Sequence, residues 1–222
     1  AKTAEKAVYS IFQPKREEAV AAIIAQMQNK DAAAYKDLDD EMKGYMDYVC
    51  DTVLTKNTGI LNSDLIDKND DTYISWAKDE VISLYTYLNY AISKNWIDTT
   101  KLGENSYSSS EEIYQEILNY LQDYLKNDSS FDKLLYENLI KSGSVTGNQV
   151  CAILYEQGVL PMDESAYNGL LSGSIGAFSW LTGKIQNLEI TPGQLALEPC
   201  SAGAVVTDPK TGKVLACVSY PG

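Results

Sequence analysis

The chain has 222 residues, of which 45% are hydrophobic and 22% charged, values that are ordinary for a globular protein of one or two domains. Its formal net charge is −13, which disfavours binding to nucleic acid or to an anionic membrane surface through a basic patch. The sequence contains no histidine, so a Ser-His-Asp triad, a Cys-His pair and a histidine-containing zinc site are excluded from this segment.

Apolar residues at helical spacing predict helices through the first half of the chain. Pro14 is expected to open the first helix, and Ser83 is expected to cap the third. Gly44, inside the second helix, is a candidate position for a bend. The three expected apolar stripes are, in order, Val20, Ile23, Ile24 and Met27; Leu38, Met42, Tyr45, Met46, Val49 and Val53; and Leu84, Tyr87, Leu88, Ala91 and Ile92.

Capping residues mark further helices in the second half of the chain. Ser109 with Glu112 matches a capping box, and the helix that follows is expected to place Ile113, Ile117, Leu121 and Tyr124 on one face. Another helix is expected to start at Ser129 or Ser130 and to end at Gly143 in a left-handed C-cap. Shorter helices are expected at residues 146–157, ended by Gly158, at 163–171 and at 175–188, with a last one beginning at Thr191 and Pro192.

The pattern changes near the C-terminus. Apolar, β-rich runs at residues 202–207 and 213–219 flank a D-P-K-T-G turn at 208–212, which predicts an antiparallel hairpin. The fold class predicted from the sequence is therefore mainly α, with one C-terminal β-hairpin. We expect a helical domain at residues 1–195 and the start of a second domain at 196–222. Because the chain begins with Ala1 and ends at Gly222, both ends are expected to lie inside a longer protein.

Short motifs in the helical part match the S-x-x-K, S-x-N and K-T-G elements of serine acyl enzymes that react with penicillin. In such enzymes the serine is the nucleophile, and a lysine one turn later accepts its proton. The matches are Ser75 with Lys78, Ser130 with Lys133, Ser93-Lys94-Asn95, Lys210-Thr211-Gly212 and Lys141-Ser142-Gly143. We reject them as a catalytic set, because S-x-x-K fixes two residues and occurs twice, Ser75 is too close to Ser93, and Lys210 falls at a hairpin tip.

Three other features have a functional and a structural interpretation. Residues 67–78 follow the calcium-loop template at Asp67, Asn69, Asp71, Tyr73 and Ser75, but Thr72 replaces its glycine and Lys78 its last glutamate. The favoured interpretation is a polar loop whose acids cap the next helix. The 16 tyrosines, which could stack on sugars, are interpreted as packing residues. The cysteines Cys50, Cys151, Cys200 and Cys217 are interpreted as small buried residues. The sequence thus predicts no catalytic, cofactor-binding or metal-binding residue.

The last stretch, from about Gln186, carries a resemblance. Residues 203–216 read G-A-V-V-T-D-P-K-T-G-K-V-L-A and are followed by Ser219, Tyr220 and Pro221. This closely resembles the junction in class B penicillin-binding proteins where the N-terminal region meets the transpeptidase domain, and residues 157–161 and 188–192 resemble accessory regions from Gram-positive anaerobes. The resemblance implies that the hairpin starts the transpeptidase sheet and that the catalytic S-x-x-K lies downstream of Gly222.

The same resemblance implies a function for the longer protein. That protein would crosslink peptidoglycan by D,D-transpeptidation, react with β-lactams, and work outside the cytoplasmic membrane, tethered by an N-terminal helix that this chain lacks. The present chain would be a non-catalytic spacer or docking region, whose partners are the transpeptidase domain of its own chain, other cell-wall synthesis proteins or a second copy. Two alternatives stay open: a self-contained serine acyl enzyme using Ser75 and Lys78, and an extracellular helical module that binds glycan or calcium.

Overall fold

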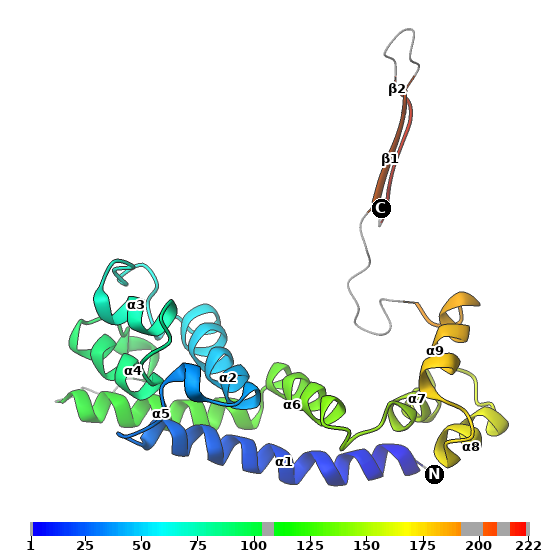
Figure 1. Cartoon of the computed structure of the whole chain (residues 1–222), viewed down its shortest axis with the longest axis horizontal. Helices are drawn as coiled ribbons and strands as arrows, with labels where there is room; N and C mark the ends of the chain where they lie inside the picture. The colour runs from blue at the N-terminus through cyan, green and yellow to red at the C-terminus, as the bar shows by residue number, and fades with distance from the viewer. Residues whose placement is uncertain (1, 104–108, 192–201, 208–213, 221–222) are drawn as a thin grey trace. The chain divides into compact units, whose positions relative to one another are not determined.

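The computed structural model describes residues 2–103, 109–191, 202–207 and 214–220. These residues are mainly helical, which confirms the mainly α part of the predicted fold class, and they include nine α-helices, α1 to α9 (Figure 1). The chain divides into two compact units. The central unit is Tyr9–Val145, and the terminal unit combines Ala1–Val8 with Thr146–Gly222. The sequence did not predict this division of the helices, and the predicted boundary at residue 196 lies outside the described residues.

Helix α1 (Thr3–Gln28) contains Pro14 in its interior, so the prediction that Pro14 opens this helix is wrong. An internal proline costs about 3 kcal/mol because it removes a backbone hydrogen bond and crowds the preceding turn. The apolar stripe continues on both sides of the proline, and its buried residues are Ala4, Val8, Phe12, Ala19, Val20, Ile23 and Met27. Burying several such side chains, at roughly 1.5–3 kcal/mol for each large one, outweighs the cost of the proline.

The second predicted helix is two different helices in the structure. After a 3₁₀ turn, η1 (Tyr35–Asp37), the α-helix α2 (Asp40–Asp47) is followed directly by a π-helix, η2 (Tyr48–Asn57). In η2 the hydroxyls of Thr55 and Thr58 donate to carbonyls five residues earlier, at 2.7 and 2.8 Å. Gly44 lies inside α2, and the widening begins after it. A periodic pattern of apolar residues does not distinguish these helix types.

Helices α3 (Asp71–Ala77) and α4 (Leu84–Ser93) complete the first half of the central unit. The predicted cap of α4 is confirmed, because the Ser83 hydroxyl accepts a hydrogen bond from the Thr86 N–H. All five residues of the predicted stripe on α4 are buried. A short 3₁₀ turn, η3 (Thr99–Lys101), follows.

Helix α5 (Ser110–Lys126) is capped by Ser109, as predicted, but its buried face is broader than predicted. Ile113 and Tyr124 are half-buried, whereas the buried residues are Tyr114, Ile117, Leu118, Leu121 and Leu125. The reason is that α5 packs against α4 and also contacts α1, where the Tyr114 hydroxyl donates to the Met27 carbonyl. Helix α6 (Ser129–Lys141) then ends before Gly143, whose φ of 75° confirms the predicted left-handed C-cap.

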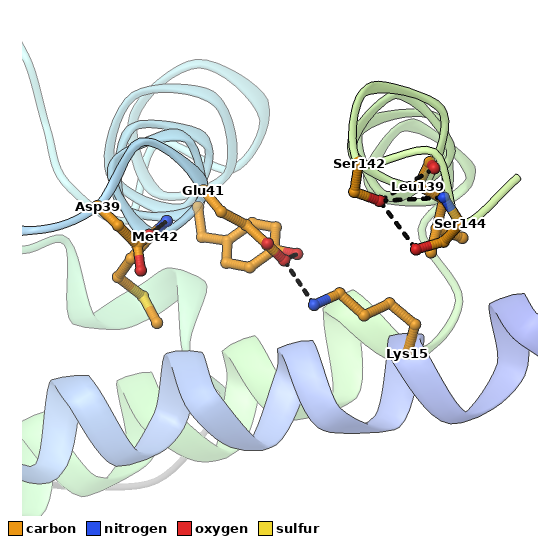
Figure 2. A network of polar contacts seen from close by, with 8 residues as sticks. Lys15, Asp39, Glu41, Met42, Leu139, Ser142 and Ser144 are labelled. Atoms are coloured by element: carbon orange, nitrogen blue, oxygen red, sulfur yellow. Dashed lines mark hydrogen bonds and ion pairs between the residues drawn. The ribbon is translucent and has the colours of Figure 1, made fainter.

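Polar contacts join α1 to the other helices of the central unit. The Lys15 ammonium lies 2.8 Å from the Glu41 carboxylate of α2, which also accepts from the Tyr45 hydroxyl at 2.6 Å (Figure 2). The Arg16 guanidinium pairs with Asp132 of α6 at 2.8 Å and donates to the last turn of α5. The hydrogen bond to Glu41 raises the pKa of Lys15, so this pair remains charged at neutral pH.

The terminal unit is built from α7 (Gly147–Glu156), α8 (Glu164–Ser172) and α9 (Ala177–Gln186). Thr146 forms a full capping box with Gln149, Gly158 has a φ of 72°, and Asp163 caps α8, so the predicted ends of α7 and α8 are confirmed. Helix α9 is shorter than the predicted 175–188. The core of this unit comprises Ala4, Cys151, Ala152, Tyr155, Leu160, Leu170, Trp180 and Ile190. The expected last helix from Pro192 lies outside the described residues.

Two strands follow. Strand β1 (Ala202–Thr207) pairs antiparallel with β2 (Val214–Tyr220), with Val205 opposite Cys217 and a shift in register between Val206 and Thr207. The turn that would join them lies outside the described residues, so the predicted hairpin and its place in a larger sheet stay predictions. Among the described helices, none is long and apolar enough to cross a membrane.

Candidate functional site

The serines of the two S-x-x-K matches form hydrogen bonds within their own helices. The Ser75 hydroxyl donates to the Asp71 carbonyl at 2.8 Å within α3, and Lys78 is the exposed C-cap of that helix. Ser130 lies in the first turn of α6, where its N–H donates to the capping Asp128, and Lys133 is exposed. Hydrogen bonds between serine and lysine are absent from both pairs as the structure describes them.

The remaining motif matches also have structural roles. The Ser93 hydroxyl donates to the Tyr90 carbonyl at 2.7 Å at the end of α4. Ser142 caps α6, and its hydroxyl contacts the Leu139 carbonyl and the Ser144 hydroxyl at 3.1 and 2.9 Å (Figure 2). Residues 210–212, the K-T-G match, lie outside the described residues. Among the described residues, the S-x-x-K, S-x-N and K-S-G matches therefore do not form one site around a common serine.

The calcium-template residues do not converge on a common centre. Asp67 accepts a hydrogen bond from the Asn69 N–H, and the Ser75 hydroxyl is used within α3. The acid that caps α3 is Asp70, which accepts from two backbone N–H groups and from the Tyr90 hydroxyl. Helix capping by this loop is thus confirmed, through a residue that the template does not use. Over the described ranges, no group of three or more His, Cys, Asp or Glu residues is placed to hold a metal ion.

Cys50 and Cys151 are buried and unpaired, which confirms their interpretation as packing residues. Burial raises the pKa of both thiols, that of Cys151 to about 11, so neither is a ready nucleophile at neutral pH. The side chains of Cys200 and Cys217 lie outside the part of the chain whose burial is described. Two of the tyrosines, Tyr87 and Tyr114, are buried packing residues, as expected.

The site that sequence reasoning missed is a cavity of about 570 Å³ in the central unit. It opens among η1, η2, α3, α4 and the loop between η2 and α3, and we call it the central cavity. Its lining combines aromatic, aliphatic and acidic side chains: Tyr35, Asp47, Cys50, Asp51, Thr55, Leu61, Ser63, Ile66, Lys68, Tyr73, Trp76, Ala77, Glu80 and Tyr87.

Aromatic rings make up a tightly packed part of the cavity wall. The Trp76 ring stacks on the Tyr87 ring with centroids 5.4 Å apart and planes 9° apart, and the edge of Tyr35 meets Trp76 at 5.4 Å. Trp76 and Tyr87 are only 8% and 1% exposed, and Leu61 is also buried. Such interlocked rings hold their positions with little freedom, so this part of the wall is preformed.

Carboxylates provide most of the charge around the cavity. Asp47 at the end of α2 and Asp51 in η2 are one turn apart, and Glu80 follows α3. Asp47 accepts a hydrogen bond from the Tyr35 hydroxyl at 2.8 Å. The pKa of Asp51 is raised, first by burial and then by the neighbouring Asp47 carboxylate. Over the described residues these three carboxylates form no ion pair, and Lys68 is the only cation among the lining residues.

Part of this site was readable in the sequence. Asp47 and Asp51 are four residues apart in a segment predicted to be helical, a spacing that places two side chains on one side of a helix, although the sequence analysis did not single them out. The contributions of Glu80 and of the aromatic rings depend on how separate elements pack, which periodicity does not report. Comparison of the chain with known protein families, with curated proteins and with solved structures finds no match.

Proposed function

We propose that this chain is the non-catalytic accessory region of a class B penicillin-binding protein, joined at residues 196–222 to the start of the transpeptidase domain. The observation that carries the proposal is the 203–216 run with the following Ser219, Tyr220 and Pro221. A motif of this length specifies much more than the two-residue S-x-x-K pattern. The bounds of β1 and β2 support it, because they fall on the two apolar arms of the motif and leave D-P-K-T-G-K between them.

The helical region then acts as a spacer or docking surface rather than as a catalyst. This assignment is supported by the structural use of the hydroxyls of Ser75, Ser93 and Ser142 in their own helices. The net charge of −13 gives the chain a long-range negative field, which would steer a basic partner surface toward it. Its partners would be its own transpeptidase domain, other cell-wall synthesis proteins or a second copy, on the outer side of the cytoplasmic membrane.

Reaction with a β-lactam tests the proposal on two proteins. Intact mass spectrometry of the present chain after incubation with penicillin should show no covalent adduct. The longer protein, which would include the downstream S-x-x-K, should be labelled stoichiometrically by a fluorescent penicillin. An adduct on the present chain that is lost in Ser75→Ala, and kept in the matched Ser130→Ala variant, would establish a self-contained acyl enzyme instead. Failure of the longer protein to label would remove the family assignment.

A deletion in the longer protein tests the separation of spacer from catalyst. Removal of residues 2–191, with β1 and β2 retained, should leave penicillin labelling of a folded protein intact while cell-wall synthesis in the organism suffers. The strands must stay, because losing them would expose the edge of the sheet to which we assign them. A folded deletion protein that no longer labels would mean that the helices contribute to the active site.

A further inference from the structure

The central cavity is lined by a buried tyrosine, Tyr87, whose hydroxyl has no protein partner, a feature independent of the penicillin-binding resemblance. The Tyr87 residue as a whole is 1% exposed and lines the cavity, and its hydroxyl forms no hydrogen bond with the described residues. Burial raises the pKa of Tyr87, and the charges of Cys50, Tyr73 and Asp51 raise it further, so Asp51 is within electrostatic range of this hydroxyl. A hydroxyl on a buried side chain that lines a cavity and has no protein partner is free to accept a hydrogen bond from a ligand group.

The charges of the residues that line the cavity indicate whether the ligand group is a cation or an anion. Asp47, Asp51 and Glu80 provide three carboxylates against the one ammonium of Lys68. The pKa of Asp51 is raised, first by burial and then by the Asp47 carboxylate, so a negative charge at Asp51 is disfavoured at this position. A cation placed between the two aspartates would offset this effect, whereas an anion would add to it.

The rest of the wall specifies the body of the ligand. Leu61, Ile66 and Ala77 are aliphatic, and the Trp76 ring adds an aromatic surface. A bare metal ion would gain nothing from these groups and would keep its demand for six or more oxygen ligands. An alkyl chain, by contrast, would be removed from water along them. Tyr35 and Tyr73 are half-buried and line the same cavity, where ring faces attract cations.

We propose that the central cavity binds a primary alkylammonium group. The ammonium has three N–H donors, which match the carboxylates of Asp51 and Asp47 and the lone pairs of the Tyr87 hydroxyl. The alkyl chain lies along the aliphatic wall. The same chemistry is carried by a free alkylamine and by the lysine side chain of a peptide. The π-helix η2 supports this assignment, because it carries Cys50, Asp51 and Thr55 on the cavity wall, and such wide helices are rare and frequent at functional sites.

Titration of the whole chain with matched probes tests the proposal. The probes are pentylammonium and its uncharged isostere 1-pentanol. Binding is measured by isothermal calorimetry and by tryptophan fluorescence, to which Trp76 of the cavity wall contributes. Pentylammonium should bind at least tenfold more tightly than 1-pentanol and should bind more weakly as salt is added. Equal affinity for the two probes, or saturable binding of Ca²⁺ without binding of pentylammonium, would overturn the proposal.

Substitutions locate the binding to this cavity. Asp51 forms no ion pair among the described residues, and asparagine has nearly the same shape, so Asp51→Asn should fold normally and weaken pentylammonium binding about tenfold, the usual effect of losing one charged hydrogen bond. Tyr87→Phe keeps the stacked ring and should weaken binding about fivefold, roughly the effect of a neutral hydrogen bond. The matched control Asp123→Asn removes an exposed carboxylate of α5 and should change nothing. Unchanged binding in both cavity variants would refute the assignment.

The source of the ammonium group is resolved by two further probes. Cadaverine presents the group on a free amine, and N-acetyl-lysine methylamide presents it on a peptide-like backbone. Binding of the lysine derivative with at least the affinity of cadaverine supports a peptide source, and preference for cadaverine supports a free amine. Failure of both, in a protein whose circular dichroism is native, contradicts the proposal.

Discussion

Glu156 tests how the terminal unit holds the start of α1. Its carboxylate accepts hydrogen bonds from the backbone N–H groups of Ala4 and Glu5, each at 2.8 Å, and from the Tyr167 hydroxyl. The first turn of a helix has N–H groups without partners inside the helix, and its dipole attracts negative charge. Glu156, at the end of α7, therefore acts as a capping group contributed from 151 and 152 residues away in the sequence.

The loss of stability expected when Glu156 is replaced can be estimated from these contacts. A hydrogen bond to a charged group contributes about 1.5–3 kcal/mol, and the helix dipole adds about 0.3–1 kcal/mol. Glu156 is half-buried, so the lower ends of these ranges apply. We expect Glu156→Ala to lower the free energy of unfolding of the terminal unit by about 2–3 kcal/mol. Glu156→Gln keeps one oxygen acceptor without the charge and should cost about 1–2 kcal/mol.

The contribution of Glu156 should depend on pH. Burial acts to raise its pKa, but the hydrogen bonds from Tyr167 and from the N–H groups of Glu5 and Ala4 outweigh it, so the pKa is lowered in the folded protein. A lowered pKa means that the stabilisation is present above the unfolded value of about 4.3 and is lost as the pH falls through the folded value. Wild type and Glu156→Gln should therefore differ in stability at pH 7 and converge in acid.

Urea unfolding followed by tryptophan fluorescence measures this effect. Trp180 is buried in the core of the terminal unit, with its indole N–H 3.3 Å from the Tyr155 hydroxyl, so its emission reports on that unit in a background where Trp76 and Trp96 of the central unit are replaced by phenylalanine. The matched control is Glu137→Ala, which removes a highly exposed carboxylate that faces Lys141 at 3.9 Å and should change stability by less than about 0.5 kcal/mol. If Glu156→Ala unfolds at the wild-type midpoint, the capping argument fails.

Two further substitutions test the packing of the two units. Gly169→Ala would place its Cβ 2.5 Å from Ile175 Cδ1, so it should lower the melting temperature and cost about 1–3 kcal/mol of stability. The control Gly183→Ala, whose Cβ would have no atom within 4 Å, should be neutral or stabilising by up to about 1 kcal/mol. An equal response of the two variants in thermal melts would contradict the close approach. In the central unit, Tyr114→Phe should cost about 1 kcal/mol in urea unfolding, because it removes the buried hydrogen bond to α1, and Tyr9→Phe, at an exposed position, should cost nothing. Equal stability of Tyr114→Phe and wild type would show that this bond contributes no net free energy.

The parts of the fold that the sequence predicts well are the helix ends, which depend on interactions between residues within one turn of each other. Ser83 and Ser109 cap helices as predicted because a side-chain oxygen next to free N–H groups needs no distant partner. Gly143 and Gly158 end helices for a comparable reason, since the left-handed conformation costs glycine little.

The predictions fail where contacts between residues far apart in the sequence determine the structure. Pro14 is a good first residue of a helix by local preference, but burial of Ala4, Val8 and Phe12 extends α1 beyond it. The buried face of α5 differs from the predicted one because α1 and α4 both contact it. The π-helix η2 is invisible to a search for apolar periodicity, and the unpartnered hydroxyl of Tyr87 follows from packing among elements between residues 35 and 87.

Helix α3 carries both Ser75 of the serine acyl enzyme hypothesis and part of the wall of the central cavity. Ser75 and Trp76 are neighbours in sequence and so point about 100° apart around the helix axis. Trp76 lines the cavity, whereas the Ser75 hydroxyl is bonded to its own backbone and does not line it. The most nucleophilic side chain on the wall is the Cys50 thiol, and its raised pKa keeps it protonated at neutral pH. A ligand in the cavity would therefore meet carboxylates, a free hydroxyl and aromatic surface, which are groups for recognition. The proposed spacer role and the proposed binding of an alkylammonium group are therefore compatible within one helical unit.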